Sequence, residues 1–494
     1  MNYIDALKEQ LNNAFTENGD KAFSTSGSYC LDYYALIGGM RHNYSQIIPM
    51  FVKAFNEDRL IAIKLLFYTR DIRGGLGERN TFRMILNYLG NFYPEIAKQL
   101  IEYIPEYGRY DDLFVLLTTP VKQEIISYIK NQLAEDIQKK KNGKSISLLA
   151  KWMPSINTSS SETRALANRL CDYLEMSRKE YRKTLSFLRE GLIIENNLRE
   201  KEYTFLYENV PSVAAHKYID AFIRNDKERY TEFIKKVNRG EVKINTAALY
   251  PYQVVKKCMD IRFEKNTDMI KSIKDSLDAT WKSFDRNEFT ENTIVVKDGS
   301  GSMTWAFGGT VMPLTIATSL AILFSEQLAE PFKNSFITFS TNPKLVTLEE
   351  NDSIFDKVMY ANRFNECSNT NISKVYNLIL KIAVSNKVSK EDMIKKIVII
   401  SDMEFDACAE GMSTFESFKQ KYELCGYDFP ELVFWNVAAR NVHLPVTMNE
   451  KNVKLVSGAS DKIISMVMNG LSKTPYDFMM EALEKYKIFD NLEL

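Results

Sequence analysis

The sequence predicts two unlike halves: an α-helical repeat domain over residues 1–289 and a doubly wound α/β domain with a parallel sheet over residues 290–494. Two observations lead to this prediction. Up to about residue 290, apolar residues recur at three- and four-residue spacing, which is the period of an amphipathic helix. Beyond it, short β-branched runs alternate with helical stretches, which is typical of parallel strands with covering helices.

In the first half, the apolar period is clearest over 47–72 and 81–104. Short breaks rich in Gly, Pro or Asp separate such segments, as in GGLGERN (74–80) and PEYGRYDD (105–112). We expect a series of antiparallel helix pairs similar to HEAT repeats. The chain has no strict sequence period, so this expectation depends on the number and length of the helices. Residues 1–15 fit an amphipathic helix rather than a targeting signal.

In the second half, the strand-like runs are continuously apolar, so we expect helices on both faces of their sheet. The predicted strands are 293–297, 336–340, 396–401, 432–438 and 453–458, and the predicted helices are 311–329, 372–385, 412–422 and 459–471. The segment 299–325 has no charged residue, but its dense apolar part, 311–324, is too short to span a membrane. A buried helix, and no membrane association, is therefore the prediction.

Composition limits the function classes. Hydrophobic residues make up 45% and charged residues 26% of the 494, which is typical of a globular protein and excludes a disordered chain. Six cysteines are scattered without a CxxC pair, which argues against a zinc ribbon and fits a reducing cytoplasm. We expect them to be small buried side chains: Cys30, Cys171, Cys258, Cys367, Cys408 and Cys425. The three histidines are far apart, so the sequence offers no local histidine site.

Charge is divided between the halves. The whole chain has 64 basic and 64 acidic side chains. Residues 51–250 carry 33 basic and 26 acidic side chains, a surplus of seven, whereas residues 301–494 carry 19 and 24, a deficit of five. Any surface that binds a polyanion is therefore expected on the helical half.

The strongest local motif follows the first predicted strand. Asp298-Gly-Ser300-Gly-Ser302 places a carboxylate and two hydroxyls where ligands bind in doubly wound sheets, at the carboxyl end of a strand. Two later loops add a hydroxyl, Thr370, and a second carboxylate, Asp402, which ends the strand 396–401. Oxygen ligands without nitrogen or sulfur suit Mg²⁺ or Mn²⁺. The sequence therefore predicts a divalent-cation site at this edge.

Three other interpretations of this motif are weaker. A haloacid-dehalogenase-like phosphatase needs a second aspartate at the position of Ser300, and a nucleotide-binding loop needs GxGxxG or GxxxxGK[ST]. A turn whose serines only cap the next helix accounts for Ser300 or Ser302, but not for Thr370 and Asp402 at the same edge. No paired general base is identifiable near Asp298, so we expect a non-enzymatic protein.

Basic residues cluster at three places in the helical half, the third of them over residues 224–239, and tyrosines accompany the later two. Arginines surround a glycine-rich break between two predicted helices, and a second basic run follows along one later helix. Basic side chains near aromatic ones can hold phosphates and stack unpaired bases, whereas solvated helix faces with acid–base pairs are the alternative. The candidate RNA-binding residues are Arg70, Arg73, Arg79, Arg83, Arg178, Lys179, Arg182, Lys183 and Arg189.

The order strand–DxSxS, then Thr, then strand–Asp resembles the von Willebrand factor A domain with its metal-ion-dependent adhesion site. By that resemblance Ser300, Ser302 and Thr370 contact the metal, and Asp298 and Asp402 hold it directly or through water. The third loop of that family reads Thr-Asp-Gly, whereas this chain has Ser-Asp402-Met403. The resemblance also implies that an acidic residue of a partner protein can complete the coordination.

A helical-repeat half before such a domain resembles the Ro autoantigen (TROVE) family. Segments such as FYTRDIRGGLGER (67–79), KWMPS (151–155) and ISDMEFD (400–406) resemble Ro-like proteins from plants, microbes and large viruses. The resemblance implies a cytoplasmic RNA-binding scaffold, with RNA held by the basic helical half, and nothing indicates DNA specificity. The alternatives are a metal-dependent protein-interaction module and an assembly protein of a virus or particle.

Overall fold

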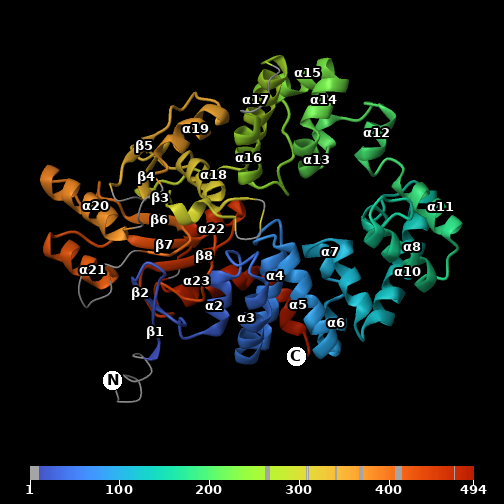
Figure 1. Ribbon diagram of the computed structural model, residues 1–494, viewed down its shortest axis with the longest axis horizontal. Coiled ribbons are helices and arrows are strands. Elements are labelled where there is room, and N and C mark those ends of the chain that lie inside the picture. The colour runs from blue at the N-terminus through green and yellow to red at the C-terminus, as the bar shows by residue number, and fades with distance from the viewer. Residues whose placement is uncertain are drawn as a thin grey trace.

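The computed structural model describes residues 11–261, 267–306, 309, 311–339, 342–366, 371–405, 414–471 and 473–494, without the side chains of 414–416. It has an N-terminal part made mainly of helices and a C-terminal sheet of six strands flanked by helices (Figure 1). The predicted fold class is therefore confirmed.

The helical part begins with the hairpin strands β1 (Asn13–Phe15) and β2 (Lys21–Phe23). Its α-helices are α2 (Tyr29–Leu36), α3 (Tyr44–Glu57), α4 (Arg59–Arg70), α5 (Arg79–Phe92), α6 (Pro94–Leu100), α7 (Ile104–Tyr107), α8 (Lys122–Lys141), α9 (Leu149–Trp152), α10 (Ser161–Tyr173), α11 (Arg178–Arg189), α12 (Ile194–Glu200), α13 (Ser212–Lys217), α14 (Ile219–Asn225), α15 (Lys227–Asn238), α16 (Pro251–Ile261) and α17 (Thr267–Lys282). Two 3₁₀ helices, η1 (Tyr110–Thr118) and η2 (Tyr207–Asn209), lie between them.

The two longest predicted helical runs are each divided at a residue with a clear physical role. Asp58 separates α3 from α4, and its side chain accepts a hydrogen bond from the Ile61 backbone N–H at 2.8 Å, which caps α4. Pro94 begins α6, where its missing N–H costs no helical hydrogen bond. The boundaries inside these runs are therefore set by capping chemistry.

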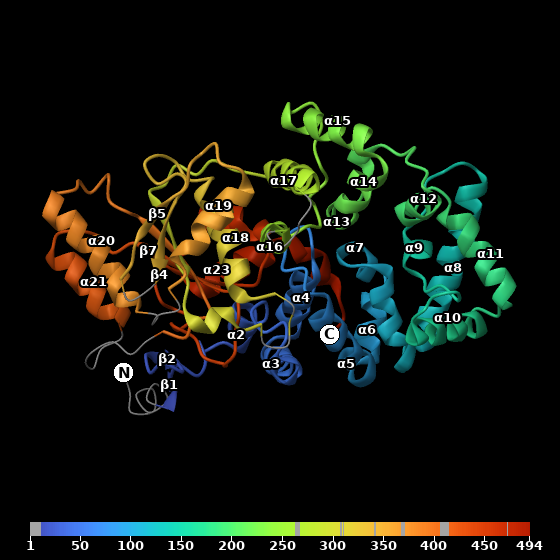
Figure 2. The ribbon, with the colours of Figure 1, turned by 45° about the horizontal axis from the view of Figure 1, so that its top comes forward.

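Helices α3 to α17 follow an arc that begins and ends against the sheet part (Figures 1 and 2). At its start, α2 packs against the last strand, β8 (Val453–Ser457), and at its end, α16 packs against α18 (Pro313–Ser325). Tyr250, just before α16, donates its hydroxyl proton to the backbone oxygen of Leu76 at 2.9 Å. The arc therefore closes into a circuit through contacts between remote segments.

The sheet has the strand order β5-β4-β3-β6-β7-β8. The remaining elements are β3 (Thr293–Asp298), η3 (Gly301–Thr304), β4 (Ser335–Phe339), β5 (Leu345–Thr347), α19 (Ile354–Ala361), η4 (Asn362–Phe364), α20 (Ile372–Asn386), β6 (Lys396–Ser401), α21 (Thr414–Leu424), β7 (Glu431–Asn436), η5 (Asp461–Ile463), α22 (Ile464–Asn469), α23 (Pro475–Leu483) and η6 (Glu484–Asn491).

Five strands pair in parallel, and the short edge strand β5 pairs antiparallel with β4. The prediction of a parallel sheet is thus correct for the five strands that it named, and it did not include β5, which has only three residues. Every residue of β3, β6 and β8 is buried, so both faces of the sheet are covered, as the apolar runs predicted.

Both ends of the described chain pack against the opposite half. Phe23 of β2 exchanges two backbone hydrogen bonds of 2.9 Å with Leu444 of the sheet part. At the other end, Phe489 of η6 stacks on Phe67 of α4 with ring centroids 4.3 Å apart. The amphipathic helix predicted over 1–15 is wrong at its end, since residues 13–15 form β1, and residues 1–10 lie outside the described residues.

Three of the six cysteines are buried as predicted, namely Cys30, Cys171 and Cys258, whereas Cys425 is exposed. Cys367 and Cys408 lie outside the described residues. In the described part of the chain, no helix has both the length and the apolar character needed to cross a bilayer. The uncharged segment near residue 311 instead contains α18, whose residues are almost all buried.

Candidate functional site

The predicted cation site lies where the sheet changes direction. Strands β3 and β6 are neighbours, but the chain leaves β3 toward β4 and leaves β6 toward β7 on the opposite side. Loops that diverge in this way create a crevice at the carboxyl ends of the strands, where ligands bind in such folds. Asp298 ends β3 and Asp402 follows β6, so the fold brings these two predicted residues to the same place.

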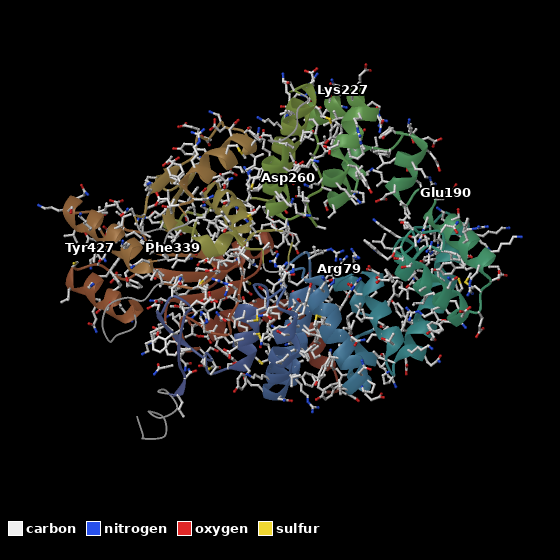
Figure 3. All side chains as sticks on the ribbon, in the orientation of Figure 1. Arg79, Glu190, Lys227, Asp260, Phe339 and Tyr427 are labelled. Carbon is white, nitrogen blue, oxygen red and sulfur yellow. The ribbon has the colours of Figure 1, made fainter. Side chains whose placement is uncertain are left out.

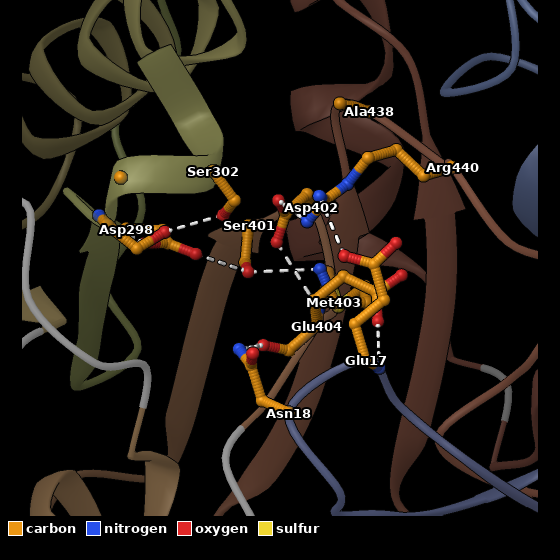
Figure 4. A network of polar contacts seen from close by, with 12 residues as sticks. Glu17, Asn18, Asp298, Ser302, Ser401, Asp402, Met403, Glu404, Ala438 and Arg440 are labelled. Atoms are coloured by element: carbon orange, nitrogen blue, oxygen red, sulfur yellow. Dashed lines mark hydrogen bonds and ion pairs between the residues drawn. The ribbon is translucent and has the colours of Figure 1, made fainter. Parts of the chain in front are cut away.

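Hydrogen bonds connect these loops. The Ser401 hydroxyl donates to Asp298 Oδ2 at 2.6 Å, and the Ser300 backbone N–H donates to Asp298 Oδ1 at 2.8 Å (Figure 4). The Ser300 and Ser302 hydroxyls are 2.9 Å apart. Thr370 lies outside the described residues. Four of the five predicted metal ligands therefore gather at one edge.

Two carboxyl groups lie near each other at this edge, and Arg440 already pairs with one of them, Asp402. Asp298 is fully buried. The two groups that donate hydrogen bonds to it, the Ser300 backbone N–H and the Ser401 hydroxyl, are both neutral. Burial, and then the negative charge of Asp402, raise the pKa of Asp298 to about 7. Among the described residues, no group of three or more His, Cys, Asp and Glu side chains gathers into a metal cluster. The edge combines two carboxylates with serine hydroxyls, a hard oxygen set that fits Mg²⁺ or Mn²⁺.

In the loop after β6, Met403 stands where the von Willebrand factor A motif that the sequence resembles has a glycine. This residue has φ of 65°, in the left-handed region that favours glycine, and its side chain is buried. The backbone therefore makes a turn that would suit a glycine, while the methionine side chain is buried in the interior. The substitution at this turn leaves Asp402 at the sheet edge.

The sequence did not reveal a second set of charged residues beside Asp402. Arg440 donates from Nη2 to Asp402 Oδ2 at 2.8 Å, and its Nη1 atom lies 2.8 Å from Glu17 Oε2. Glu404 accepts a hydrogen bond of 2.7 Å from the Glu17 backbone N–H (Figure 4). The hairpin turn between β1 and β2 is thereby fastened to the cation-site loops. No local pattern could have indicated this, because residues 17 and 404 are 387 positions apart.

The predicted RNA-binding residues have different environments. Arg70 is buried and donates from Nε to Asp112 at 2.8 Å. Arg189 donates to the backbone oxygens of Ala150 and Met153 and to the Ser155 hydroxyl, so it holds the KWMPS segment together. Both side chains contribute to the structure of the helical part and have little capacity left for a ligand.

Other members of the set are exposed. Arg73 donates to the Glu106 backbone oxygen at 2.8 Å, and Arg178 is 2.6 Å from Asp172. In contrast, four exposed residues make no ion pair within the described ranges: Arg79, Lys179, Arg182 and Lys183. The acid–base pairing expected of a simple solvated helix face is therefore present for Arg178 but absent for these four.

Arg79 belongs to a cluster that we call the basic patch: Arg79, Arg83, Arg109 and Trp152. Partial burial, and then the neighbouring guanidinium groups of Arg109 and Arg83, lower the pKa of Arg79. The Arg109 guanidinium lies 3.7 Å from the centroid of the Trp152 ring. In Figure 3, Arg79 lies at the inner edge of the arc, with Asp260 to its upper left and Glu190 to its upper right in this view. Arg109 and Trp152 were not predicted, because only the fold brings them to α5.

Comparisons with known proteins give four findings. A family model described as a domain of unknown function, DUF2828, matches residues 16–125 and 123–287, and a second, DUF7788, matches 292–487. Uncharacterized protein L728 of Acanthamoeba polyphaga mimivirus is 30% identical over 515 residues, which cover 96% of this chain and 88% of that protein. The crystal structure of the Ro (RSR) protein of Deinococcus radiodurans is 12% identical with a TM-score of 0.45, over 91% of this chain and 100% of that one. A similarity this distant says nothing about function.

Proposed function

The chain belongs to the DUF2828 family, and from this premise we propose that it is a non-enzymatic, cytoplasmic RNA-binding scaffold with a divalent-cation site in its C-terminal domain. The basic patch on the inner edge of the arc is the observation that carries the proposal. The sequence resemblance to the Ro family and the surplus of positive charge on the helical half agree with it.

The patch has the chemistry that single-stranded RNA requires. Five guanidinium groups lie close together there, those of Arg41, Arg70 and the three arginines of the patch, and the carboxylates beside them are those of Asp111, Asp112 and Glu78. The surplus of two positive charges attracts phosphates, and the Arg109–Trp152 pair offers flat surfaces on which bases can stack. Arg79 is exposed, so it can reach a phosphate directly.

A second basic surface lies on α11. Lys179, Arg182 and Lys183 are exposed on this helix, and they make no ion pair within the described part of the chain. Phosphate contacts of this kind add affinity without sequence specificity. We assign this surface an accessory role, because Tyr181, the aromatic residue within this run, is buried and offers no face to a base.

The experiment is a titration of a fluorescent single-stranded RNA with the full chain, followed by anisotropy, at salt concentrations between about 50 and 200 mM. We expect the affinity of the wild type to fall steeply with salt. Arg79→Glu should weaken binding and lower the slope of log K against log salt by about 0.7 for each phosphate that the variant no longer neutralises. Lys390→Glu, an exposed charge reversal in the sheet part, is the matched control. Wild-type binding that is absent, or that Arg79→Glu leaves unchanged, contradicts the proposal.

A second candidate function, cation-dependent docking of an acidic partner protein, is favoured by the buried carboxylate of Asp298. Asp298, Ser300, Ser302 and Asp402, with Thr370, would hold Mg²⁺ or Mn²⁺. The ion would neutralise the buried charge and offer a coordination position to a partner's carboxylate. Within the chain, Ser401 orients Asp298, and Arg440 orients Asp402 through their hydrogen bonds.

Titration with Mn²⁺ or Mg²⁺ by calorimetry and thermal unfolding tests the cation site. Saturation at about one hundred times Kd should stabilise the wild type by about 2.7 kcal/mol, and Asp298→Asn should abolish this response. RNA binding should survive both Asp298→Asn and EDTA, whereas partner docking should disappear with either. A wild type that is not stabilised by either cation rules out the site.

A further inference from the structure

A cavity of about 590 Å³ lies between the helical and sheet parts, next to the cation-site loops. Its walls come from the segment after α2, the residue before α5, the helices α16 and α18, the loops that follow β3 and β7, and the hairpin turn. Volumes of this size are typical of sites for small molecules, which favour domain junctions and the carboxyl ends of parallel strands. Neither the basic patch nor the cation site uses this space.

The charges on the cavity wall are balanced. Arg41 Nη2 is 3.2 Å from Glu78 Oε1, and the guanidinium of Arg440 lies between Glu17 and Asp402. Each guanidinium on the wall therefore already faces a carboxylate, and an added phosphate would also meet the negative charges of Glu17 and Glu78. This balance favours a ligand without net charge inside the cavity.

The wall also has an aromatic and apolar part. Tyr252 lines the cavity, and its ring is stacked on Tyr250 with centroids 5.5 Å apart and planes inclined by 14°. Pro313, Ile316 and Val437 add apolar surface. A flat ring can stack on the tyrosine, and such stacking on aromatic side chains accepts every nucleobase.

Polar groups on the same wall suit hydroxyls and ring edges. The carboxylates of Glu17 and Glu78 are acceptors, and carboxylates commonly accept hydrogen bonds from ribose hydroxyls. Asn441 Nδ2 donates to Glu17 and Glu404 at 3.0 Å each, so the side-chain oxygen of Asn441 is the part of this amide that can accept a hydrogen bond from the edge of a base. Arg41 Nη2 lies 3.2 Å from Glu78 Oε1 but is buried without a hydrogen bond in the described part of the chain, so its N–H groups can donate to a ligand acceptor.

We propose that this cavity binds a ribonucleoside, with its base on Tyr252 and its free 2′,3′-diol on the carboxylates of the wall. Two sources share this chemistry, a free nucleoside and the 3′-terminal nucleoside of an RNA. The second rests on the proposed RNA binding, and it is sterically reasonable because Glu78 immediately precedes Arg79 of the basic patch. Binding of a free nucleoside does not depend on the proposed RNA binding.

The test is calorimetric and NMR titration of the full chain with adenosine and uridine at millimolar concentrations. Adenosine should bind, and 2′,3′-dideoxyadenosine and adenosine 3′-monophosphate should bind at least about tenfold more weakly. Tyr252→Ala should lower the affinity by about tenfold or more, and Tyr252→Phe should retain it. Ala306→Leu fills the cavity from a half-exposed position, so it should weaken binding without unfolding the chain. Tyr360→Ala, on the surface of α19, is the matched control and should change nothing.

Two RNA oligonucleotides that differ only in a 3′-hydroxyl or a 3′-phosphate distinguish the sources. A preference for the 3′-hydroxyl that Ala306→Leu removes identifies the RNA end, whereas nucleoside binding without such a preference identifies a free nucleoside. Nucleoside binding by a chain that binds no RNA overturns the proposed function and leaves the cavity proposal standing. The cavity proposal is wrong if neither nucleoside binds and the 3′ group has no effect, or if Tyr252→Ala and Ala306→Leu bind adenosine as well as the wild type does.

Discussion

Replacing Phe489 with alanine should release the C-terminal segment 484–494 from the helical part. Phe489 is fully buried in η6, although the residues it contacts lie some 400 positions away on α4 and α7. Its ring stacks on Phe67 at 4.3 Å and meets Tyr103 at 5.1 Å and Tyr107 at 5.7 Å between centroids. This side chain therefore joins the end of the chain to the first helices of the arc.

The structure sets the size of the effect. Truncation of a buried phenylalanine to alanine usually costs about 3–5 kcal/mol, which includes the cavity left behind. The upper part of that range is expected here, because three aromatic contacts each contribute about 0.5–1.5 kcal/mol beyond the buried area. The segment keeps a second attachment at Tyr486, whose buried ring contacts Tyr107 at 5.6 Å between centroids and whose hydroxyl donates to Asp71 at 3.0 Å, but that attachment is unchanged by the substitution and does not offset the loss at Phe489.

Hydrogen exchange of residues 484–494 is the appropriate assay, because a chain of this length need not unfold in one step. Loss of about 4 kcal/mol accelerates exchange limited by local opening by roughly a thousandfold. Ile488→Ala is the matched control, because the Ile488 side chain, next to Phe489 in the sequence, is 44% exposed and its truncation should have little effect. Exchange that is equally slow in Phe489→Ala and Ile488→Ala would refute the reasoning.

Two further predictions concern buried charge. Burial, and then the positive charge of Lys257, lower the pKa of His216 from 6.5 to about 4. Between pH 4 and pH 6.5 the unfolded chain therefore binds more protons than the folded chain. The contribution of His216 to the free energy of unfolding is complete above pH 6.5 and falls toward pH 4, by at most about 3 kcal/mol. Thermal unfolding of His216→Gln across this range should depend less on pH than that of the wild type. Glu326 is buried and accepts a hydrogen bond of 2.8 Å from the buried amine of Lys357. Glu326→Gln should therefore lower the free energy of unfolding by about 3 kcal/mol, measured by thermal unfolding. Glu350 pairs with Lys333 at the surface, so Glu350→Gln is the control and should leave the stability unchanged.

The parts of the fold that were predictable depend on neighbouring residues. The predicted strand 396–401 coincides with β6, and the predicted strand 293–297 is β3 without its last residue. Such runs are recognisable because a strand buried on both faces is continuously apolar. The convergence of Asp298 and Asp402 was predictable for the same reason, since carboxyl ends of parallel strands meet at one edge.

Other features were beyond local patterns. Strand β5 has three residues, so neither its period nor its antiparallel pairing leaves a mark in the sequence. Arg70 and Arg79 also look alike in the sequence, yet one is buried against Asp112 and the other is exposed. Whether a side chain is exposed depends on which remote residues pack against it.

The sequence by itself determined the helical and α/β halves and the pair of aspartates at the sheet edge, because these follow from apolar period and strand polarity within short windows. Tertiary structure alone decided that the arc closes at Tyr250 and Leu76, that Arg440 joins Asp402 to Glu17, and that a cavity remains between the halves. Such contacts join residues tens to hundreds of positions apart, and they form only when the packing of the whole chain brings them together.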